Sequence, residues 1–244
     1  MNPLLRTHML TKHFAGIRAV GPVDFTATSG EIVGIIGPNG CGKTTFFNVV
    51  SGFMKPTAGQ VFWEGEDIVS VPAHRRARLG MVRTFQERMV FPGTSVRENL
   101  QTALIQHGVD DIGDEAVTAA LDYVGLPRQV IDQLAGNLSW GECRLLGMAL
   151  GLVLKPKIVL LDEPFAGLNR VGAERVTSTL RRLRGDGIGA VIVEHEMDLL
   201  LPLCDRVVVL ANGEILAEGT SKEILQREDV RAVYFGGDPV ARDQ

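Results

Sequence analysis

The sequence predicts an α/β fold organised around a parallel β-sheet. Three short apolar runs are typical of buried strands, and they cover Ile32 to Ile36, Ile158 to Leu161 and Ala190 to Val193. The first run leads into a glycine-rich turn and then into residues 44–53 (TTFFNVVSGF), whose pattern is that of a helix. A strand, a tight turn and a helix in this order open an α/β unit, so these strands are expected to lie parallel.

Two further segments predict antiparallel strands beside this core. Gly59 to Ile68 (GQVFWEGEDI) alternates around a glycine, which is typical of a strand with a turn. Val207 to Leu216 (VVVLANGEIL) contains Asn212-Gly213, and this dipeptide favours a two-residue hairpin turn.

The middle of the chain, from Glu87 to Lys155, has a helical pattern broken by glycine and proline, as at Pro92-Gly93. Its clearest predicted helices are Ala116 to Val124 and Glu142 to Leu154. No internal repeat or low-complexity linker separates this stretch from its neighbours. We therefore expect a helical insert within the α/β core.

Composition narrows the class of protein. The 244 residues are 45% hydrophobic and 22% charged, which is typical of a globular chain with a sizeable core and excludes a disordered one. The net charge of −4 gives no basic footprint for nucleic acid. Three widely spaced cysteines favour neither a disulfide framework nor a zinc site, and they fit a reducing compartment. No apolar run reaches the ~18 residues of a membrane span.

A phosphate-binding loop is the strongest motif. It matches G-x-x-x-x-G-K-[ST] between a predicted strand and a predicted helix, and it comprises Gly37, Pro38, Asn39, Gly40, Cys41, Gly42, Lys43, Thr44 and Thr45. Glycines let successive N–H groups face one phosphate, and the helix N-terminus adds its dipole. Lys43 is expected to reach the β- and γ-phosphates, and the Thr44 hydroxyl is expected to ligate Mg²⁺. The alternative is a glycine-rich turn that happens to contain a lysine.

Two acids, Asp162 and Glu163, end the second apolar run. Ligands of open α/β sheets bind at the carboxyl edge of the strands, where these carboxylates would lie. We expect Asp162 to hold Mg²⁺, directly or through water, and Glu163 to orient and deprotonate the attacking water. Two solvated acids are the alternative, but the phosphate loop makes a P-loop nucleotidase the better interpretation.

The pentapeptide Leu138-Ser139-Trp140-Gly141-Glu142 precedes a predicted helix and resembles the L-S-G-G-Q signature of ATP-binding-cassette (ABC) ATPases. In that family the signature contacts the γ-phosphate bound by the opposite subunit, which implies nucleotide contacts for Ser139, Gly141 and Glu142. Trp140 replaces the first glycine, and Glu142 replaces the glutamine. Taken alone, Ser139 could simply be a helix N-cap.

Further matches to the family follow in order along the chain. Phe14 corresponds to the aromatic residue that stacks on adenine, although a lone phenylalanine is more often a core residue. Gln86 matches the glutamine that senses Mg²⁺ and water and faces the transporter, and Asn169 ends a D-loop in which aspartate is commoner. His195 matches the switch histidine that contacts the γ-phosphate. Taken singly, the last three could be a loop residue, a turn and a structural histidine.

The resemblance extends from Phe14 to Gly236. It implies an ATPase that uses ATP and Mg²⁺, with a RecA-like P-loop core, an antiparallel β-subdomain and an inserted α-helical subdomain. The single domain, 1–244, would divide into a core with its β-subdomain (1–86 and 156–220), a helical subdomain (87–155) and a C-terminal tail (221–244). Catalytic roles fall on Glu163, His195 and Gln86, and metal contacts on Thr44, Gln86 and Asp162.

Residues 83–86 (RTFQ), 166–169 (AGLN), 194–197 (EHEM) and 233–236 (VYFG) resemble the ATPases of branched-chain amino acid importers. Gly147-Met148 resembles their relatives that import urea and short amides. Either importer implies membrane permease subunits, a solute-binding protein and a peripheral position on the cytoplasmic face of the membrane. The extra charge of Glu142 is expected to oppose closure of two identical chains, which favours a heterodimer with a second ATPase subunit.

Two other classes of protein remain as alternatives. A soluble ABC protein of DNA repair or translation usually carries tandem cassettes, coiled-coil arms or basic patches. A P-loop kinase would need an acceptor pocket and an arginine-rich lid, and it would leave the signature and His195 unexplained. Co-purification with membrane permeases separates the importer from both alternatives.

Overall fold

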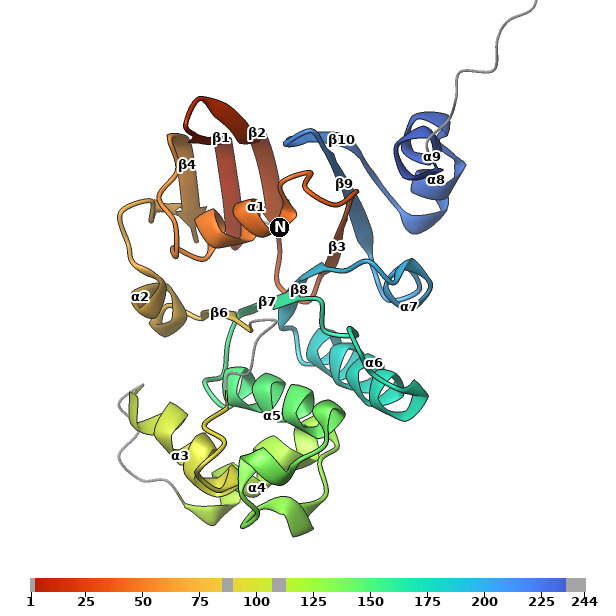
Figure 1. The fold of residues 1–244 in the computed structure, drawn as a ribbon. Helices are drawn as coiled ribbons and strands as arrows, with labels where there is room; N and C mark the ends of the chain where they lie inside the picture. Colours follow the sequence, from red (N-terminus) through yellow and green to blue (C-terminus); the bar gives the residue numbers. More distant parts are fainter. Residues whose placement is uncertain (1–2, 85–89, 107–112, 236–244) are drawn as a thin grey trace, which may run out of the picture.

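The structure is a computed structural model, and it describes residues 3–84, 90–106 and 113–235. These residues form two β-sheets, a layer of helices below them and further helices around the sheets (Figure 1). The smaller sheet lies at the upper left of the view, the larger sheet lies near the centre, and helices α3, α4 and α5 form the lower layer.

The larger sheet has the strand order β10-β9-β3-β8-β7-β6. Its strands are β3 (Ile32–Ile36), β6 (Met81–Arg83), β7 (Ile158–Asp162), β8 (Gly189–Val193), β9 (Arg206–Ala211) and β10 (Glu214–Gly219). All neighbours are parallel except β9 and β10, which form an antiparallel hairpin at the edge. Every residue of β3, β7 and β8 is buried, as expected for strands covered on both faces.

The smaller sheet is antiparallel and has the strand order β2-β1-β4-β5. Its strands are β1 (Leu5–Phe14), β2 (Ile17–Ala27), β4 (Ala58–Trp63) and β5 (Glu66–Asp67). Its buried side chains, such as Phe25 and Val61, pack with Phe46 and Phe47 of α1 (Lys43–Val50). This core joins the phosphate loop helix to the small sheet.

The described residues between β6 and β7 are mainly helical. The helices are α3 (Val96–Gln106), α4 (Asp114–Val124) and α5 (Trp140–Leu152), with two 3₁₀ turns at Arg128–Val130 and Ala135–Asn137. Buried residues of these helices belong to the same hydrophobic cluster as β7 and β8, so the helical layer is packed onto the large sheet. None of the helices in the described residues is long and apolar enough to span a membrane.

The remaining helices are α2 (Ala73–Arg78), α6 (Arg170–Gly185), α7 (Met197–Leu200), α8 (Ser221–Gln226) and α9 (Glu228–Phe235). Helix α6 packs against β8, and the α8–α9 pair lies beside β10 and β9 in Figure 1. Tyr234 of α9 packs on the main hydrophobic core.

The α/β fold with a parallel sheet is confirmed. The predicted strands correspond to β3, β7 and β8, with one extra residue in each of β7 and β8. The turn in 59–68 and the Asn212-Gly213 hairpin are also present. The helix predicted over 44–53 begins at Lys43 and ends at Val50, and the helix predicted over 142–154 is α5, which begins and ends two residues earlier.

Candidate functional site

The phosphate loop runs from the end of β3 to the start of α1. Its backbone passes so close to other chain segments that side chains are excluded at two positions. A Cβ at Gly42, where φ is 107°, would lie 2.4 Å from the Ala19 carbonyl oxygen. A Cβ at Gly37 would lie 2.2 Å from the Leu210 carbonyl oxygen. Glycine at these positions lets the loop pack tightly between β2 and β9.

Lys43 folds back over this loop. Its Nζ donates to the carbonyl oxygens of Gly37 at 2.6 Å and Pro38 at 3.0 Å. The N-cap of α1 is Gly42, and no side chain makes a capping hydrogen bond there. N–H groups of the first helical turn therefore have no capping side chain and can receive an anion. Thr44 is exposed beside them, and Thr45 is half-buried.

Asp162 lies at the carboxyl end of β7 and is bound by a buried arginine. The Asp162 Oδ2 accepts a hydrogen bond from Arg83 Nη2 at 2.9 Å, and both side chains are at most 5% exposed. Arg83 Nη1 also donates to Asn48 Oδ1 at 2.6 Å and to Ser51 Oγ at 3.0 Å. Burial raises the pKa of Asp162, although the charge of Arg83 opposes this shift. Arg83 therefore fixes one oxygen of the carboxylate and ties β7 to α1.

Glu163 and His195 face each other across the ends of β7 and β8. Glu163 Oε1 lies 3.1 Å from His195 Nε2, and the side chains are 21% and 42% exposed. Glu163 has a φ of 49°, in the left-handed region that residues other than glycine rarely occupy. Its N–H donates to the Val193 carbonyl oxygen at 2.8 Å. The Glu163 carboxylate and the His195 imidazole therefore lie side by side in a partly exposed position.

Glu194, next to His195, is 2% exposed and organises the backbone around this pair. Its Oε2 accepts from the Phe165 N–H at 3.0 Å, and its Oε1 accepts from the His195 N–H at 2.8 Å. Burial raises the pKa of Glu194, while these backbone hydrogen bonds favour the carboxylate. The side chain thus joins the turn after Glu163 to the segment that carries His195.

The signature begins α5 with a capping box. The Ser139 Oγ accepts from the Glu142 N–H at 3.3 Å, and the Glu142 Oε2 accepts from the Ser139 N–H at 2.9 Å and from the Ser139 hydroxyl at 2.7 Å. These hydrogen bonds from Ser139 lower the pKa of Glu142. The carboxylate is therefore turned back onto Ser139, and the signature serine is a helix N-cap as well as a candidate phosphate ligand.

The remaining predicted residues are Phe14, Asn169 and Gln86. Phe14 ends β1 at the tip of the β1–β2 hairpin, where it is 43% exposed and has Lys12 Nζ 5.2 Å from its ring centroid. Asn169 caps α6 by accepting from the Gly172 N–H at 2.9 Å. Gln86 lies outside the described residues.

The phosphate loop, the Asp162–Glu163 pair and His195 all follow the adjacent strands β3, β7 and β8, so they share the carboxyl edge of one sheet. The signature Ser139 instead lies on the helical layer, and Phe14 lies on the small sheet. The structural roles of Arg83 and Glu194 were not predicted from the sequence. One signal was present, because Arg83 is a charged residue that directly follows the apolar residues Met81 and Val82.

The family of the chain follows from comparison with known proteins. A family model described as ABC transporter matches residues 20–166. The probable branched-chain amino acid transport ATP-binding protein LivG of Archaeoglobus fulgidus is 38% identical over 247 residues, which is 96% of this chain and 95% of that protein. The lipopolysaccharide export system ATP-binding protein LptB of Escherichia coli K12 is 36% identical, over 94% of this chain and 95% of that protein.

Solved structures that resemble this chain belong to the same family. A crystal structure of the ADP conformation of an ATP-binding cassette of an ABC transporter superposes with a TM-score of 0.87 and 31% identity, covering 97% of this chain and all of that one. A nucleotide-free cassette gives a TM-score of 0.85 with the same identity. The chain is therefore an ATP-binding, ATP-hydrolysing member of the ABC transporter family.

Proposed function

We propose that this chain is the energy-coupling subunit of an ABC importer for branched-chain amino acids. The observation that carries the proposal is the 38% identity to LivG over almost the whole of both chains, together with the 35% identity to the branched-chain amino acid transport protein BraF of Pseudomonas aeruginosa. In this role ATP binding closes two cassettes and hydrolysis reopens them. Because only ATP has a γ-phosphate to contact both cassettes, it favours the closed state more than ADP does.

The residues at the sheet edge fit a Mg²⁺ ion. Mg²⁺ prefers oxygen ligands and is usually held by one or two carboxylates together with substrate phosphates. The exposed Thr44 hydroxyl and the Asp162 carboxylate supply such oxygens, and Arg83 engages Oδ2 of that carboxylate. When bound, the ion would neutralise charge that develops on the phosphates. We propose the same role for Gln86.

Glu163 is the proposed base for the attacking water, and His195 is the proposed contact to the γ-phosphate. Their 3.1 Å separation lets the imidazole hold the carboxylate in place while its ring remains partly exposed to the nucleotide side. The Glu194 carboxylate accepts hydrogen bonds from the Phe165 and His195 N–H groups, which holds the two backbone segments that carry this pair together. This arrangement activates water by positioning and proton transfer.

We propose that the nucleotide is sandwiched between two chains. The phosphate loop of one chain and the pair Ser139 and Gly141 of the other would hold one ATP. A bacterial ABC transporter cassette that is 25% identical, with a TM-score of 0.79 over 89% of this chain, has been solved as a dimer. The acidic Glu142 favours a heterodimer with a second ATPase subunit.

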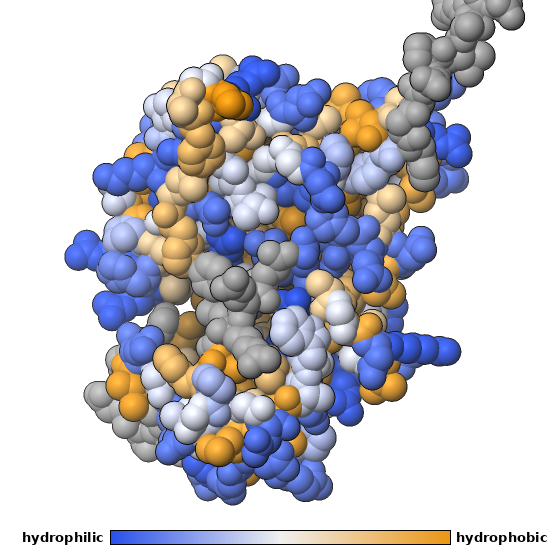
Figure 2. Space-filling model, viewed as in Figure 1, coloured by the Kyte–Doolittle hydropathy of each residue, from blue (hydrophilic) through white to orange (hydrophobic). Residues whose placement is uncertain are grey.

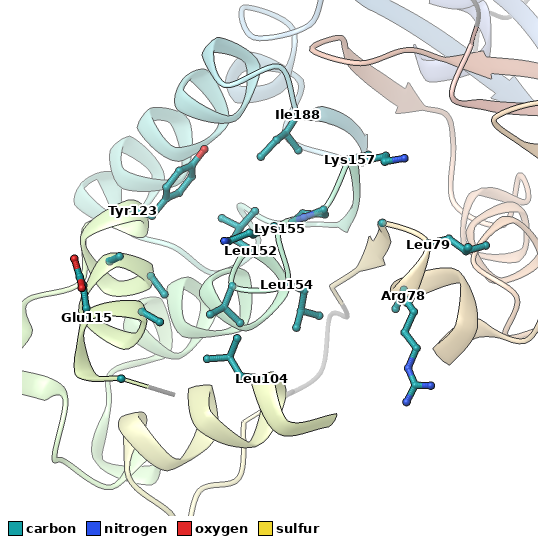
Figure 3. Close-up of a pocket in the computed structure, with 18 residues that line it drawn as sticks. Arg78, Leu79, Leu104, Glu115, Tyr123, Leu152, Leu154, Lys155, Lys157 and Ile188 are labelled. Carbon is teal, nitrogen blue, oxygen red and sulfur yellow. The ribbon is translucent and has the colours of Figure 1, made fainter. Parts of the chain in front are cut away.

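A groove between the core and the helical layer is the proposed docking surface for the membrane permease. In Figure 3 its floor carries Leu104, Leu152 and Leu154, while Arg78 and Glu115 lie toward its ends. Its volume is about 1120 Å³. Hydrophobic patches are also exposed over the helical layer in Figure 2. Among the exposed apolar side chains of residues 90–106 are Phe91 and Ile105, at 56% and 63%. An apolar floor with charged side chains beside it, including Lys155 next to Leu152, suits a short amphipathic helix.

Reconstitution of the transporter tests the solute. The chain is purified with its membrane subunits and second ATPase, placed in liposomes with the solute-binding protein, and supplied with ATP on the cassette side. We expect ATP-dependent uptake of radiolabelled leucine, isoleucine or valine that is absent with Glu163→Gln. Uptake of urea or a short amide instead would assign the chain to the related importers.

Lipopolysaccharide export is the second candidate, because the LptB match is almost as strong as the LivG match. Mass spectrometry of the co-purified membrane proteins distinguishes the two. A solute-binding protein and two permeases support import. ATP-dependent release of lipopolysaccharide from the same proteoliposomes, without amino acid uptake, would replace the import proposal.

Lys43→Ala is expected to weaken ATP binding. Hydrogen bonds to charged groups contribute about 1.5–3 kcal/mol, which corresponds to roughly tenfold to a hundredfold in affinity. Titration with a fluorescent ATP analogue measures the change, and Lys222→Ala on the exposed face of α8 serves as the control. Equal affinities for Lys43→Ala and the control would show that the loop does not use its lysine for phosphate.

Phe14→Ala is expected to weaken ATP and GTP binding to a similar degree. A ring that stacks on a base face discriminates little between bases, and such stacking contributes about 1–3 kcal/mol in nucleic-acid complexes. Ile17→Ala, at the same hairpin and 74% exposed, is the matched control. A loss confined to ATP would contradict stacking as the dominant contact.

Glu142→Gln is expected to strengthen ATP-induced dimerisation of this chain. The carboxylate accepts the Ser139 hydroxyl proton, so that proton is not available to a phosphate. A glutamine amide can donate to the Ser139 Oγ and release the hydroxyl proton, and it also removes a like charge. Light scattering with ATP in the Glu163→Gln background measures the dimer. If the Glu163→Gln chain dimerises equally well with and without Glu142→Gln, then Glu142 does not hinder closure.

A further inference from the structure

Trp140, the signature residue that departs most from the family pattern, contacts a turn of its own chain. The indole Nε1–H donates to the Ala166 carbonyl oxygen at 3.3 Å. Ala166 and Gly167 belong to the D-loop that follows Asp162 and Glu163 in the sequence. The tryptophan remains 46% exposed, so it lies on the turn without being buried in the core.

Gly167 is fitted to the indole. Its φ is 72°, and a Cβ there would lie 2.9 Å from Trp140 Nε1, which is closer than a Cβ atom approaches a non-bonded atom unless one of the two is displaced. Gly141 lies beside Leu168 of the same turn, since a Cβ on it would be 3.5 Å from a Leu168 methyl group. The start of α5 and the D-loop therefore have complementary shapes.

Arg144, one helical turn after Trp140, holds the same carbonyl. Its Nη2 approaches the Ala166 oxygen at 3.5 Å, and its guanidinium carbon lies 5.7 Å from the Trp140 ring centroid. Burial lowers the pKa of Arg144, and the negative charges of Glu194, Glu163 and Asp162 oppose this shift. Arg144 thus extends from the signature helix toward the acidic residues of the active site.

Residues 194–195, which include the switch histidine, also contact this turn. Phe165 donates its N–H to Glu194, and Glu194 in turn accepts from the N–H of His195. The contacts therefore run without a break from Trp140 through residues 165–167 to Glu194 and His195.

Resting on the proposed two-chain sandwich, we propose that Trp140 is a positioning residue that latches the signature to the D-loop of the same chain. Ser139 would face the nucleotide of one site while Glu163 and His195 serve the other. The latch makes the two faces of one chain move as one body, so occupation of one site biases the geometry that the chain offers at the second. A glycine at position 140 would lack this connection.

The physical contact is tested in the isolated chain. Trp140→Gly is expected to raise amide hydrogen exchange in residues 165–168 by about tenfold, because loss of the indole permits local opening of the turn. Trp140→Phe keeps the apolar surface but lacks the donor, and it is expected to show a smaller increase. Wild-type exchange in Trp140→Gly would overturn the proposal.

The coupling is tested by a double-mutant cycle on ATP-induced dimerisation in the Glu163→Gln background. Trp140→Gly and Gly167→Ala are each expected to weaken the dimer, and the double variant is expected to lose less than the sum of the two single losses. The strain of alanine at a φ of 72° is present in both backgrounds, so it cancels in the cycle. Additive effects, or dimers as tight as the parent, would overturn the latch.

The two readouts separate this proposal from the proposed function. Failure of the Glu163→Gln chain itself to dimerise with ATP would count against the two-chain sandwich for this chain alone. In that case the exchange measurement decides whether the latch exists. Thermal denaturation of each variant, followed by circular dichroism, shows that the comparison is made between folded proteins.

Discussion

Glu163→Gln is expected to bind ATP but to hydrolyse it roughly 10²–10⁴-fold more slowly, which is the contribution of a positioned general base. The amide is nearly isosteric and its oxygen can still accept from the imidazole that lies 3.1 Å away. It cannot take a proton from water. Single-turnover phosphate release measures the loss, and a fluorescent ATP analogue measures binding.

A matched substitution makes this result specific. Glu196→Gln alters an exposed acid two residues from Glu194 and lowers the negative charge by the same amount. We expect this control to hydrolyse ATP at the wild-type rate. Phosphate release at the wild-type rate by Glu163→Gln would show that another group activates the water.

Arg83→Ala is expected to destabilise the fold by about 3–5 kcal/mol, because breaking a buried pair leaves an uncompensated charge. Asp162 is 4% exposed, and Arg83 supplies its ionic partner as well as hydrogen bonds to Asn48 of α1 and to Ser51 just after that helix. Burial also lowers the pKa of Arg83, as expected where desolvation outweighs the attraction of its partner. Urea denaturation followed by circular dichroism measures the free energy of unfolding.

Arg170→Ala provides the comparison for Arg83→Ala. Arg170 pairs with Glu174 on the surface of α6, where the side chains are 92% and 64% exposed. Such pairs contribute about 0–1 kcal/mol. If the two arginine variants unfold at the same urea concentration, the Arg83–Asp162 pair is not a determinant of stability.

The positions of the phosphate loop and of the two acids at the sheet edge could be predicted because they depend on the order of neighbouring residues in the sequence. Glycines that follow a buried strand and acids that end another must lie at the carboxyl edge when the strands are parallel. The partner of Asp162 could not be predicted in this way. Arg83 lies 79 residues before Asp162, and only the pairing of β6 with β7 brings the two together.

Two other features depended on tertiary packing. The β1–β2 hairpin was missed because its first strand, LRTHMLTKHF, mixes charged and apolar residues, and because the Ala15-Gly16 turn lacks the asparagine or aspartate of common hairpins. The role of Trp140 was not predicted because its complement, Gly167, is separated from it by a helix and a strand.

The bonds from Lys43 to the carbonyl oxygens of Gly37 and Pro38 have a consequence for the energetics of ligand capture. They close the loop into a ring that holds its shape through the protein's own atoms. The conformational entropy of these residues is therefore lost when the chain folds and does not reduce the free energy of nucleotide association. In the role proposed for Lys43, a phosphate would exchange places with two carbonyl oxygens around one ammonium group, in a loop that is already folded.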